Sequence, residues 1–434
     1  MASGENLIRN PGFGAVSSAA PADWETWTPR AEIAPEFGVD RDGGRSSSGA
    51  ARIRCRGAEQ IGVWRQRCAG VRGGQTYRFT GYFRTKKIAS AQEAVWIKLE
   101  WLNASGQQAA KDYVSHFLPE GEWMRVEDLV PAPADAVAVV VELGLQWCEG
   151  TVWWDDLTLA ISPPSPPRKV RVSTACFMPP APTTPEKNLA FYAAKVDQAG
   201  RAGADIVCLG ETINYVSTGR KADEVAEPIP GPSTKTLGEA ARRHHLWIVT
   251  SLYEREGKCV YNTAVLIDRQ GKVAGRYRKT HLPETEMLAG VTPGTEYPVF
   301  QTDFGTIGIQ ICYDNFFPEV ARSLALQGAE ILFTPIWGDA REEGYDWDIV
   351  ARSRAIDNAV HFVASAYTHK RSLIIDPGGR ILADTKGQEE LVTADLELDR
   401  RRLEPWLSVG AFGEWKRLYP KERRPATYGQ LIRR

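Results

Sequence analysis

The sequence lacks the features that mark membrane, secreted and nucleic-acid-binding proteins. No apolar run approaches the ~18 residues that a membrane-spanning helix needs. The formal net charge is −1 and no long basic run is present, which argues against nucleic acid or an anionic membrane surface as a partner. Residues 1–14 lack a charged start followed by an apolar stretch, so no signal peptide is predicted. We expect a cytoplasmic protein, or a secreted one if a signal has been removed.

Disulfide and zinc signatures are also missing. The seven cysteines are odd in number, and they form no CxxC pair and no histidine-rich spacing. Cys55 and Cys68 could pair in an oxidising compartment, but two reduced thiols are the preferred interpretation. We therefore predict free thiols and no metal site.

What the sequence does contain divides it in two at residues 162–167 (SPPSPP). Four prolines in six positions favour an extended polyproline spacer. Nine of the fourteen tryptophans lie before it, although that part is little more than a third of the chain. Because 434 residues are expected to form two or three domains, we place one at 1–161 and another at 168–434.

Residues 1–161 show strand patterns and no convincing helix. Apolar and polar residues alternate at 76–84 (TYRFTGYFR) and at 94–102 (AVWIKLEWL), and further apolar strands follow at 136–145 and 151–160. Turn residues recur every ~8–12 positions, which is typical of an antiparallel β-sandwich.

The two ends of this region carry a resemblance. Residues 5–13 (ENLIRNPGF) and 152–159 (VWWDDLTL) are similar to carbohydrate-binding modules of the jelly-roll type. The resemblance implies a jelly-roll sandwich and a carbohydrate partner, with exposed tryptophans stacking on sugar rings. The candidates are Trp24, Trp27, Trp64, Trp96 and Trp153. The alternatives are that these rings fill the core, or that the sandwich serves packing or assembly. Related modules often hold calcium, but Asp155 and Asp156 alone do not define its ligands.

Residues 168–434 alternate strand and helix patterns, which predicts an α/β domain. At 184–199, Thr184 is a helix cap, a proline takes the first helical position, and apolar residues follow on one face. Residues 233–245 and 345–360 show the same behaviour.

A cysteine ends the most informative strand pattern, in residues 306–322 (TIGIQICYDNFFPEVAR). The apolar strand stops at Cys312, and Pro318 opens a helix with Glu319 in its first turn. Backbone N–H groups at such a strand-to-helix turn can lower the pKa of a thiol and receive an oxyanion. A lone cysteine after an apolar strand is more often a small core residue, so its interpretation depends on other residues.

Two charged residues follow strands in comparable positions upstream. The strand within 204–214 ends at Glu211, and the strand within 272–286 ends at Lys279. If these strands are parallel, Glu211, Lys279 and Cys312 meet in one crevice at the carboxyl edge of a sheet. A carboxylate to take the thiol proton, a cation to hold developing negative charge and a sulfur nucleophile together predict a cysteine hydrolase. Taken singly, Glu211 would be a salt-bridge residue and Lys279 a surface lysine.

Short sequence motifs around these residues make residues 168–434 similar to the nitrilase, or carbon–nitrogen hydrolase, superfamily. The matching motifs are LGET, YNTAVLID, YRKTHL, ICYDNFFPE, RSRAIDN, IIDPGG and RRPATY. The resemblance implies an α-β-β-α sandwich, a Glu-Lys-Cys catalytic set, no cofactor, and a homodimer or larger homo-oligomer. It also implies a second glutamate after the lysine. Glu286 is preferred to Glu284 because of its distance from the turn at Pro293-Gly294.

The residues after the cysteine bear on the substrate. Tyr313 and Asp314 resemble the amidase and carbamoylase branches, since nitrile hydrolysers tend to have Trp-Glu there. Asn315 and Phe316 stand where relatives acting on carbamoyl α-amino acids carry arginines, which puts a carboxylate-bearing substrate in doubt. The segment is closer to the carbamoylputrescine amidase branch, and acidic residues beyond Trp337 could suit a cationic substrate unless they form a solvated loop. These acidic residues are Asp339, Glu342 and Glu343.

We predict cysteine-dependent hydrolysis of a non-peptide C–N bond, in an amide or N-carbamoyl substrate, through a thioester. The predicted catalytic residues are Glu211, Lys279, Cys312 and Glu286, and the predicted substrate contacts are Tyr313, Asn315 and Trp337. Three alternatives stay open. They are nitrile hydrolysis on the same residues, a papain-like pairing of Cys312 with His281, and a mainly carbohydrate-binding protein with a silent hydrolase domain.

Overall fold

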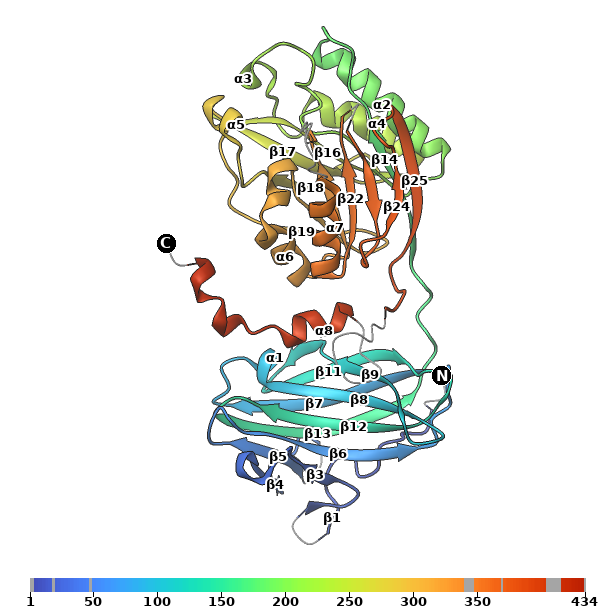
Figure 1. The fold of residues 1–434 in the computed structure, drawn as a ribbon, viewed down its shortest axis with the longest axis vertical. Helices are drawn as coiled ribbons and strands as arrows, with labels where there is room; N and C mark the ends of the chain where they lie inside the picture. Colours follow the sequence, from blue (N-terminus) through green and yellow to red (C-terminus); the bar gives the residue numbers. More distant parts are fainter. Residues whose placement is uncertain are drawn as a thin grey trace. The chain divides into compact units, whose positions relative to one another are not determined.

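The chain forms two compact units. The computed structural model describes residues 4–17, 20–46, 49–338, 347–367, 370–402 and 415–432. One unit consists of residues 1–166 together with 401–434, and the other of residues 167–400 (Figure 1). The division falls in the proline-rich segment, which has no regular secondary structure. The predicted hydrolase segment ran to residue 434, whereas the structure groups the C-terminal tail with the first unit.

Two antiparallel sheets build the first unit, in the strand orders β10-β11-β7-β13-β5-β4 and β3-β6-β12-β8-β9. The strands of the six-stranded sheet are β4 (Glu36–Asp40), β5 (Ala50–Cys55), β7 (Thr76–Lys86), β10 (Phe117–Glu120), β11 (Trp123–Pro131) and β13 (Gly150–Ile161). Those of the five-stranded sheet are β3 (Glu25–Trp27), β6 (Ile61–Ala69), β8 (Val95–Asn103), β9 (Gln108–Val114) and β12 (Ala136–Gln146). The smaller elements are β1 (Val16–Ser17), β2 (Ala20–Pro21), α1 (Ala91–Ala94) and α8 (Trp415–Glu422).

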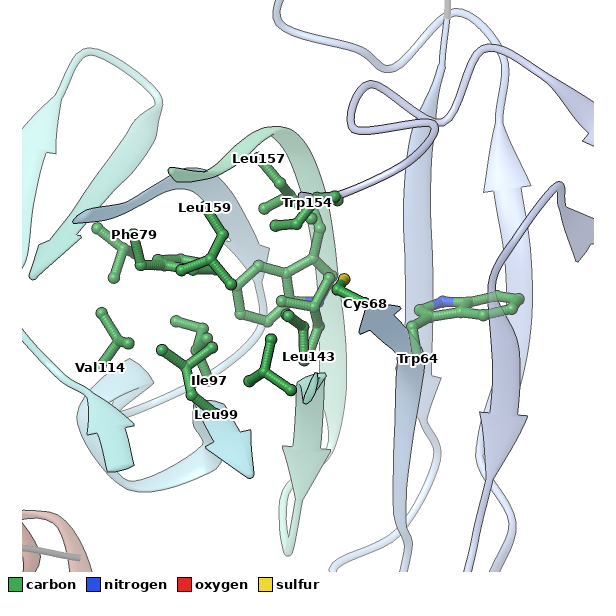
Figure 2. Packing of buried hydrophobic residues seen from close by; sticks show 14 of the residues in the cluster. Trp64, Cys68, Phe79, Ile97, Leu99, Val114, Leu143, Trp154, Leu157 and Leu159 are labelled. Carbon is green, nitrogen blue, oxygen red and sulfur yellow. The ribbon is translucent and has the colours of Figure 1, made fainter. Parts of the chain in front are cut away.

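The period-two pattern of the sequence places the core of this unit. Tyr77, Phe79 and Phe83 on β7 are fully buried, while Arg78 between them is exposed, as alternation along a strand requires. Figure 2 shows Phe79 in the packed core together with Ile97 and other buried apolar side chains of this unit. The strand predictions at 76–84 and 94–102 are therefore confirmed.

Three of the five candidate sugar-stacking tryptophans are buried. Trp24 is 5% exposed and Trp64 only 1%, and both belong to the apolar core. Trp96 is 7% exposed because its ring lies over Gly144 of the neighbouring strand, where any Cβ would approach the ring within 2.2 Å. Trp153 is half-buried and Trp27 is 40% exposed, so these two keep accessible rings.

The C-terminal helix α8 is attached to the sandwich through a buried lysine. Lys421 is 6% exposed, and its Nζ donates to the backbone carbonyls of Gln92 at 2.7 Å and Val95 at 2.5 Å. Burial lowers the pKa of Lys421 to about 8. Docking of the tail therefore places an ammonium group where its charged form is disfavoured.

We expect docking of α8 to strengthen between pH 8 and pH 10.5, the docked and free pKa values of Lys421. In that window the undocked tail binds more protons than the docked tail, so raising the pH favours docking, by about 3 kcal/mol in total. Limited proteolysis of the tail across this range would measure the effect. Lys421→Met should remove the pH dependence; the same dependence in that variant would contradict the assignment.

The second unit contains two six-stranded sheets, in the orders β18-β17-β16-β15-β14-β25 and β19-β20-β21-β22-β23-β24 (Figure 1). The strands of the first sheet are β14 (Lys169–Cys176), β15 (Ile206–Cys208), β16 (Trp247–Glu256), β17 (Cys259–Ile267), β18 (Val273–Arg278) and β25 (Glu390–Glu397). Those of the second are β19 (Val299–Gln301), β20 (Thr306–Ile309), β21 (Ile331–Pro335), β22 (His361–Ser365), β23 (Leu373–Ile375) and β24 (Ile381–Asp384). The helices are α2 (Pro185–Arg201), α3 (Ala222–Val225), α4 (Pro232–His244), α5 (Glu284–Leu288), α6 (Pro318–Leu326) and α7 (Trp347–Asn358).

Three apolar layers hold this unit together. The central layer joins the two sheets, and its buried residues include Val172, Ile206, Ile309 and Phe333. Helices α2 and α4 cover the outer face of the first sheet, and α6 and α7 cover that of the second. This arrangement is the predicted α-β-β-α sandwich. The predicted cap of α2 is also present, since the Thr184 side chain accepts from the N–H of Lys187.

The strand before Lys279 reaches its direction through an antiparallel hairpin. Strands β14, β15 and β16 are parallel neighbours, and so are β20, β21 and β22. Strand β18, which precedes Lys279, runs antiparallel to its neighbour β17, and β17 runs antiparallel to β16, so β18 points in the same direction as β15 and β16. The reason for the hairpin is the short turn at 268–272, in which Gly271 has φ +79°, because a tight turn can join only antiparallel neighbours.

Candidate active site

Cys312 stands on a strained turn between β20 and α6. It begins a 3₁₀ turn, Cys312–Phe316, and has φ +44°, a conformation that non-glycine residues seldom adopt. Pro318 then begins α6 with Glu319 in the first turn, as predicted. The turn leaves Cys312 half-buried at the wall of a cavity of about 1000 Å³.

A buried carboxylate anchors this turn. Asp314 is fully buried and accepts hydrogen bonds from the Tyr277 hydroxyl at 2.7 Å and the Ile311 N–H at 3.0 Å. It also accepts from the backbone N–H of His281 at 3.0 Å and lies 2.9 Å from His281 Nδ1. The imidazole ring stacks on Phe317 with centroids 3.8 Å apart. These contacts give His281 a role in holding the turn, which argues against the papain-like alternative.

Lys279 lies between two carboxylates at the same cavity. Its Nζ is 2.8 Å from Glu211 Oε1 and 2.7 Å from Glu286 Oε2. Asn262 connects the two acids from behind, because its Nδ2 donates to Glu211 at 2.8 Å and to Glu286 at 2.7 Å. All four side chains are buried, whereas Glu284 is exposed. The structure thus brings Glu286, and not Glu284, to the lysine.

The charges of this cluster set its protonation. Burial opposes the charged form of Lys279, but the neighbouring Glu211, Cys312 and Glu286 raise its pKa well above the usual value. Burial, reinforced by the charge of Glu211, raises the pKa of Cys312. The resting sulfur is therefore a thiol, and it needs an adjacent base to become a nucleophile. Burial likewise raises the pKa of Glu286.

Trp337 contributes to both the cavity and the cluster. Its backbone N–H donates to Glu211 Oε2 at 2.8 Å, and its ring packs edge-on against Tyr367, with centroids 4.8 Å apart. The Tyr367 hydroxyl in turn donates to the backbone carbonyl of Glu211. Glu211 is thereby held by contacts from three sides, which orients its carboxylate.

Only one of the three predicted substrate contacts is among the described residues that line the cavity. Trp337 lines the cavity, but Tyr313 and Asn315 are not among its lining residues. Asn315 is 1% exposed and accepts from Gln310 Nε2 at 2.9 Å, because the 3₁₀ turn directs it inward. The acidic residues Asp339, Glu342 and Glu343 lie outside the described residues.

Comparison with known protein families identifies the family of this chain. The family model for carbon–nitrogen hydrolases matches residues 173–406, more than half of the chain. The chain belongs to the carbon–nitrogen hydrolase family. The prediction of a carbon–nitrogen hydrolase is confirmed.

This carbon–nitrogen hydrolase has relatives that match between a third and two thirds of its chain. This chain is 33% identical over 237 residues to the deaminated glutathione amidase of Synechocystis sp. The match covers 49% of this chain and 87% of that protein. The chain is 37% identical over 181 residues to the β-ureidopropionase of Arabidopsis thaliana, covering 39% of this chain and 44% of that protein. A carbon–nitrogen hydrolase structure from Helicobacter pylori G27 superposes with a TM-score of 0.52 at 22% identity, over 62% of this chain and 99% of that chain, which supports the fold.

Sequence reasoning missed two residues of the hydrolase site. Asn262 bridges both glutamates, and Asp314 holds the turn that carries the cysteine. Both lie inside sequence motifs that carried the resemblance, YNTAVLID and ICYDNFFPE. Their place in those motifs could have indicated that they belong to the site, but their roles depend on contacts that only the fold creates.

Two kinds of feature are absent from the described residues. No helix in the described ranges is long and apolar enough to cross a membrane. Across the same ranges, no group of three or more His, Cys, Asp or Glu is arranged to hold a metal ion.

We expect Asp314→Ala to lower kcat by about 10²-fold, because displacing the cysteine by ~1 Å is enough for such a loss. It should also lower the free energy of unfolding by about 1–3 kcal/mol for each buried donor left unpaired. Steady-state kinetics and denaturant unfolding would measure the two effects. Tyr277→Phe removes a single donor and should have a smaller effect on both; unchanged kcat in folded Asp314→Ala would contradict the anchoring role.

Proposed function

We propose that this hydrolase cleaves the C–N bond of a small amide or N-carbamoyl compound through a thioester on Cys312. The observation that supports this most is the buried Glu211–Lys279–Glu286 cluster beside a half-buried thiol at one cavity. A base, a fixed cation and a sulfur nucleophile are the groups that acyl transfer requires.

In the first half-reaction, Glu211 takes the proton of Cys312 and the thiolate attacks the carbonyl carbon of the substrate. The ammonium of Lys279 and the backbone N–H of Tyr313 stabilise the tetrahedral oxyanion, at about 3 kcal/mol per donor. Collapse of this intermediate breaks the C–N bond. Ammonia or an amine leaves with the proton that Glu211 had taken, and the acyl group stays on sulfur.

In the second half-reaction, a water molecule replaces the leaving group. Glu211 takes a proton from the water, and the hydroxide attacks the thioester carbonyl under the same two oxyanion donors. Breaking the C–S bond releases the acid, and the thiolate recovers its proton from Glu211. Glu286 and Asn262 act as positioning residues, since their contacts keep Lys279 and Glu211 in place.

Ammonia release from amides, N-carbamoyl compounds and nitriles would test this proposal. Release is expected from amides or carbamoyl compounds, in keeping with relatives named as an amidase and a ureidopropionase. Release from nitriles alone would favour the alternative chemistry on the same residues. No release from any class would overturn the proposal.

We also propose that the sandwich binds carbohydrate at Trp153. This half-buried ring lies in register between Arg52 and Arg84 on neighbouring strands, beside a hollow of about 360 Å³. A ring face next to cations suits a sugar that carries an acidic group. Affinity electrophoresis in an acidic polysaccharide should retard the full chain. Trp153→Ala should abolish the retardation, while Trp147→Ala, an exposed ring outside the hollow, should keep it.

Self-association as a dimer or larger oligomer stays a prediction. Light scattering of the full chain in solution would test it.

A further inference from the structure

Four cationic side chains line the exposed part of the catalytic cavity. Arg220 and Lys221 precede α3, Arg255 lies near the end of β16, and Lys258 lies in the turn to β17. We call these four residues the cationic rim. Among the described lining residues, the carboxylates are Asp223 and the two that already bind Lys279. Positive charge therefore predominates away from the reactive sulfur.

Among the described residues, several arginines of the same unit are neutralised by carboxylates, and the rim is not. Arg168, Arg269 and Arg278 each bind a carboxylate at 3.0 Å or less. Within the described part of the chain, none of the four rim side chains forms an ion pair with a carboxylate. Unpaired cations that gather at the entrance of a cavity raise the local concentration of anions there.

Arg255 is the most strongly positioned member of the rim. It is half-buried, its backbone N–H donates to the carbonyl of Glu227 at 2.7 Å, and its Nη2 donates to the carbonyl of Asp223. A carbonyl fixes the guanidinium without cancelling its charge. The remaining donors of a fixed guanidinium match the two oxygens of a carboxylate.

We propose that the cationic rim binds a carboxylate at the far end of the substrate, so that the enzyme prefers amides of dicarboxylic acids over neutral or cationic amides. This inference rests on the proposed amide hydrolysis at Cys312. A cavity of about 1000 Å³ leaves room for a chain of several carbons between the scissile amide and the carboxylate.

The proposal reverses the expectation drawn from the residues after the cysteine. The absence of arginine at 315 and 316 counted against a carboxylate-bearing substrate. In the structure Asn315 is buried and neither position lines the cavity, so those residues do not report on the substrate's charge. The cations that can meet the substrate come from segments far away in the sequence.

Three amides of equal chain length would test the preference: glutaramate (anionic), pentanamide (neutral) and 5-aminopentanamide (cationic). We expect kcat/KM for glutaramate to exceed that for pentanamide by about 100-fold, since one or two charge-assisted hydrogen bonds contribute that much. The preference should fall as ionic strength rises, because the rim is largely exposed. Equal rates for glutaramate and pentanamide, or a preference for the cationic amide, would overturn the inference while leaving the proposed amide hydrolysis standing.

Variants locate the preference on the rim. Arg255→Gln should raise KM for glutaramate by about 30-fold and change kcat by less than about 3-fold, so that the preference for glutaramate over pentanamide falls. Lys272→Gln removes an exposed cation of the same unit that does not line the cavity. It should leave kcat and KM unchanged for both glutaramate and pentanamide. An unchanged KM for glutaramate in Arg255→Gln would remove that residue from the proposed site.

A binding measurement separates the two proposals. Glutarate should bind to the Cys312→Ala variant in calorimetry, and Arg255→Gln in that background should weaken the binding about 30-fold. Inactivity on all three amides and on N-carbamoyl compounds would overturn the proposed function. Binding of glutarate that depends on Arg255 would still support an anion site, and no binding would overturn it.

Discussion

Replacing Cys312 by alanine is expected to lower kcat by about 10⁴-fold or more and to leave the fold intact. Among the described residues that line the cavity, Cys312 alone offers a sulfur to form the acyl intermediate, so the chemical step is lost. Alanine adds no backbone strain at φ +44°, because its side chain is the Cβ that cysteine also carries, without the sulfur. Ammonia release and thermal denaturation of the variant would measure activity and folding.

Two comparisons sharpen that experiment. Cys259→Ala changes another half-buried cysteine of the same unit that does not line the cavity, and it should keep normal activity. Intact-mass analysis of the unmodified enzyme with substrate should show an acyl adduct that is missing in Cys312→Ala. Ordinary activity in Cys312→Ala would end the assignment of the nucleophile.

Lys279→Met is expected to lower kcat by about 10³-fold and the free energy of unfolding by about 3–5 kcal/mol. Lys279 is 1% exposed and binds both Glu211 and Glu286, so its removal leaves two buried carboxylates without a counter-ion. The same change removes one of the two proposed oxyanion donors. Denaturant unfolding and steady-state kinetics report the two consequences separately.

A double variant distinguishes charge burial from catalysis. Adding Glu286→Gln to Lys279→Met removes one of the two uncompensated carboxylates, so it should recover a large part of the stability. Activity should not recover, because the cation that stabilises the oxyanion is still missing. Recovery of both quantities together would mean that Lys279 acts only by holding the fold.

The predictions that succeeded depend on residues near one another in the chain. Thr184 caps α2 and Pro318 begins α6 because capping is decided within one turn. The alternation around Phe79 predicts which face of β7 is buried, since neighbouring side chains point to opposite faces. Glu211, Lys279 and Cys312, which each follow a strand, also line one cavity as expected, while their catalytic roles stay a prediction.

The features that sequence did not predict depend on distant contacts. Trp96 was one of five candidates for a sugar-stacking ring, but the missing side chain of Gly144 lets its ring lie against the next strand. Asn315 was expected to face the substrate because it is close to Cys312 in sequence, and the 3₁₀ turn buries it instead. The bridge formed by Asn262 joins residues that are 51 and 24 positions away, which no local pattern encodes.

The return of residues 401–434 to the first unit makes the hydrolase unit an insertion within the sandwich unit. During synthesis, residues 167–400 leave the ribosome before α8, so the hydrolase unit can fold while the sandwich still lacks its last helix. A protease that cuts within 162–167 would then leave two fragments that still hold each other through Lys421 and its carbonyl partners. The segments before and after the hydrolase unit are therefore joined by non-covalent contacts as well as by the peptide chain.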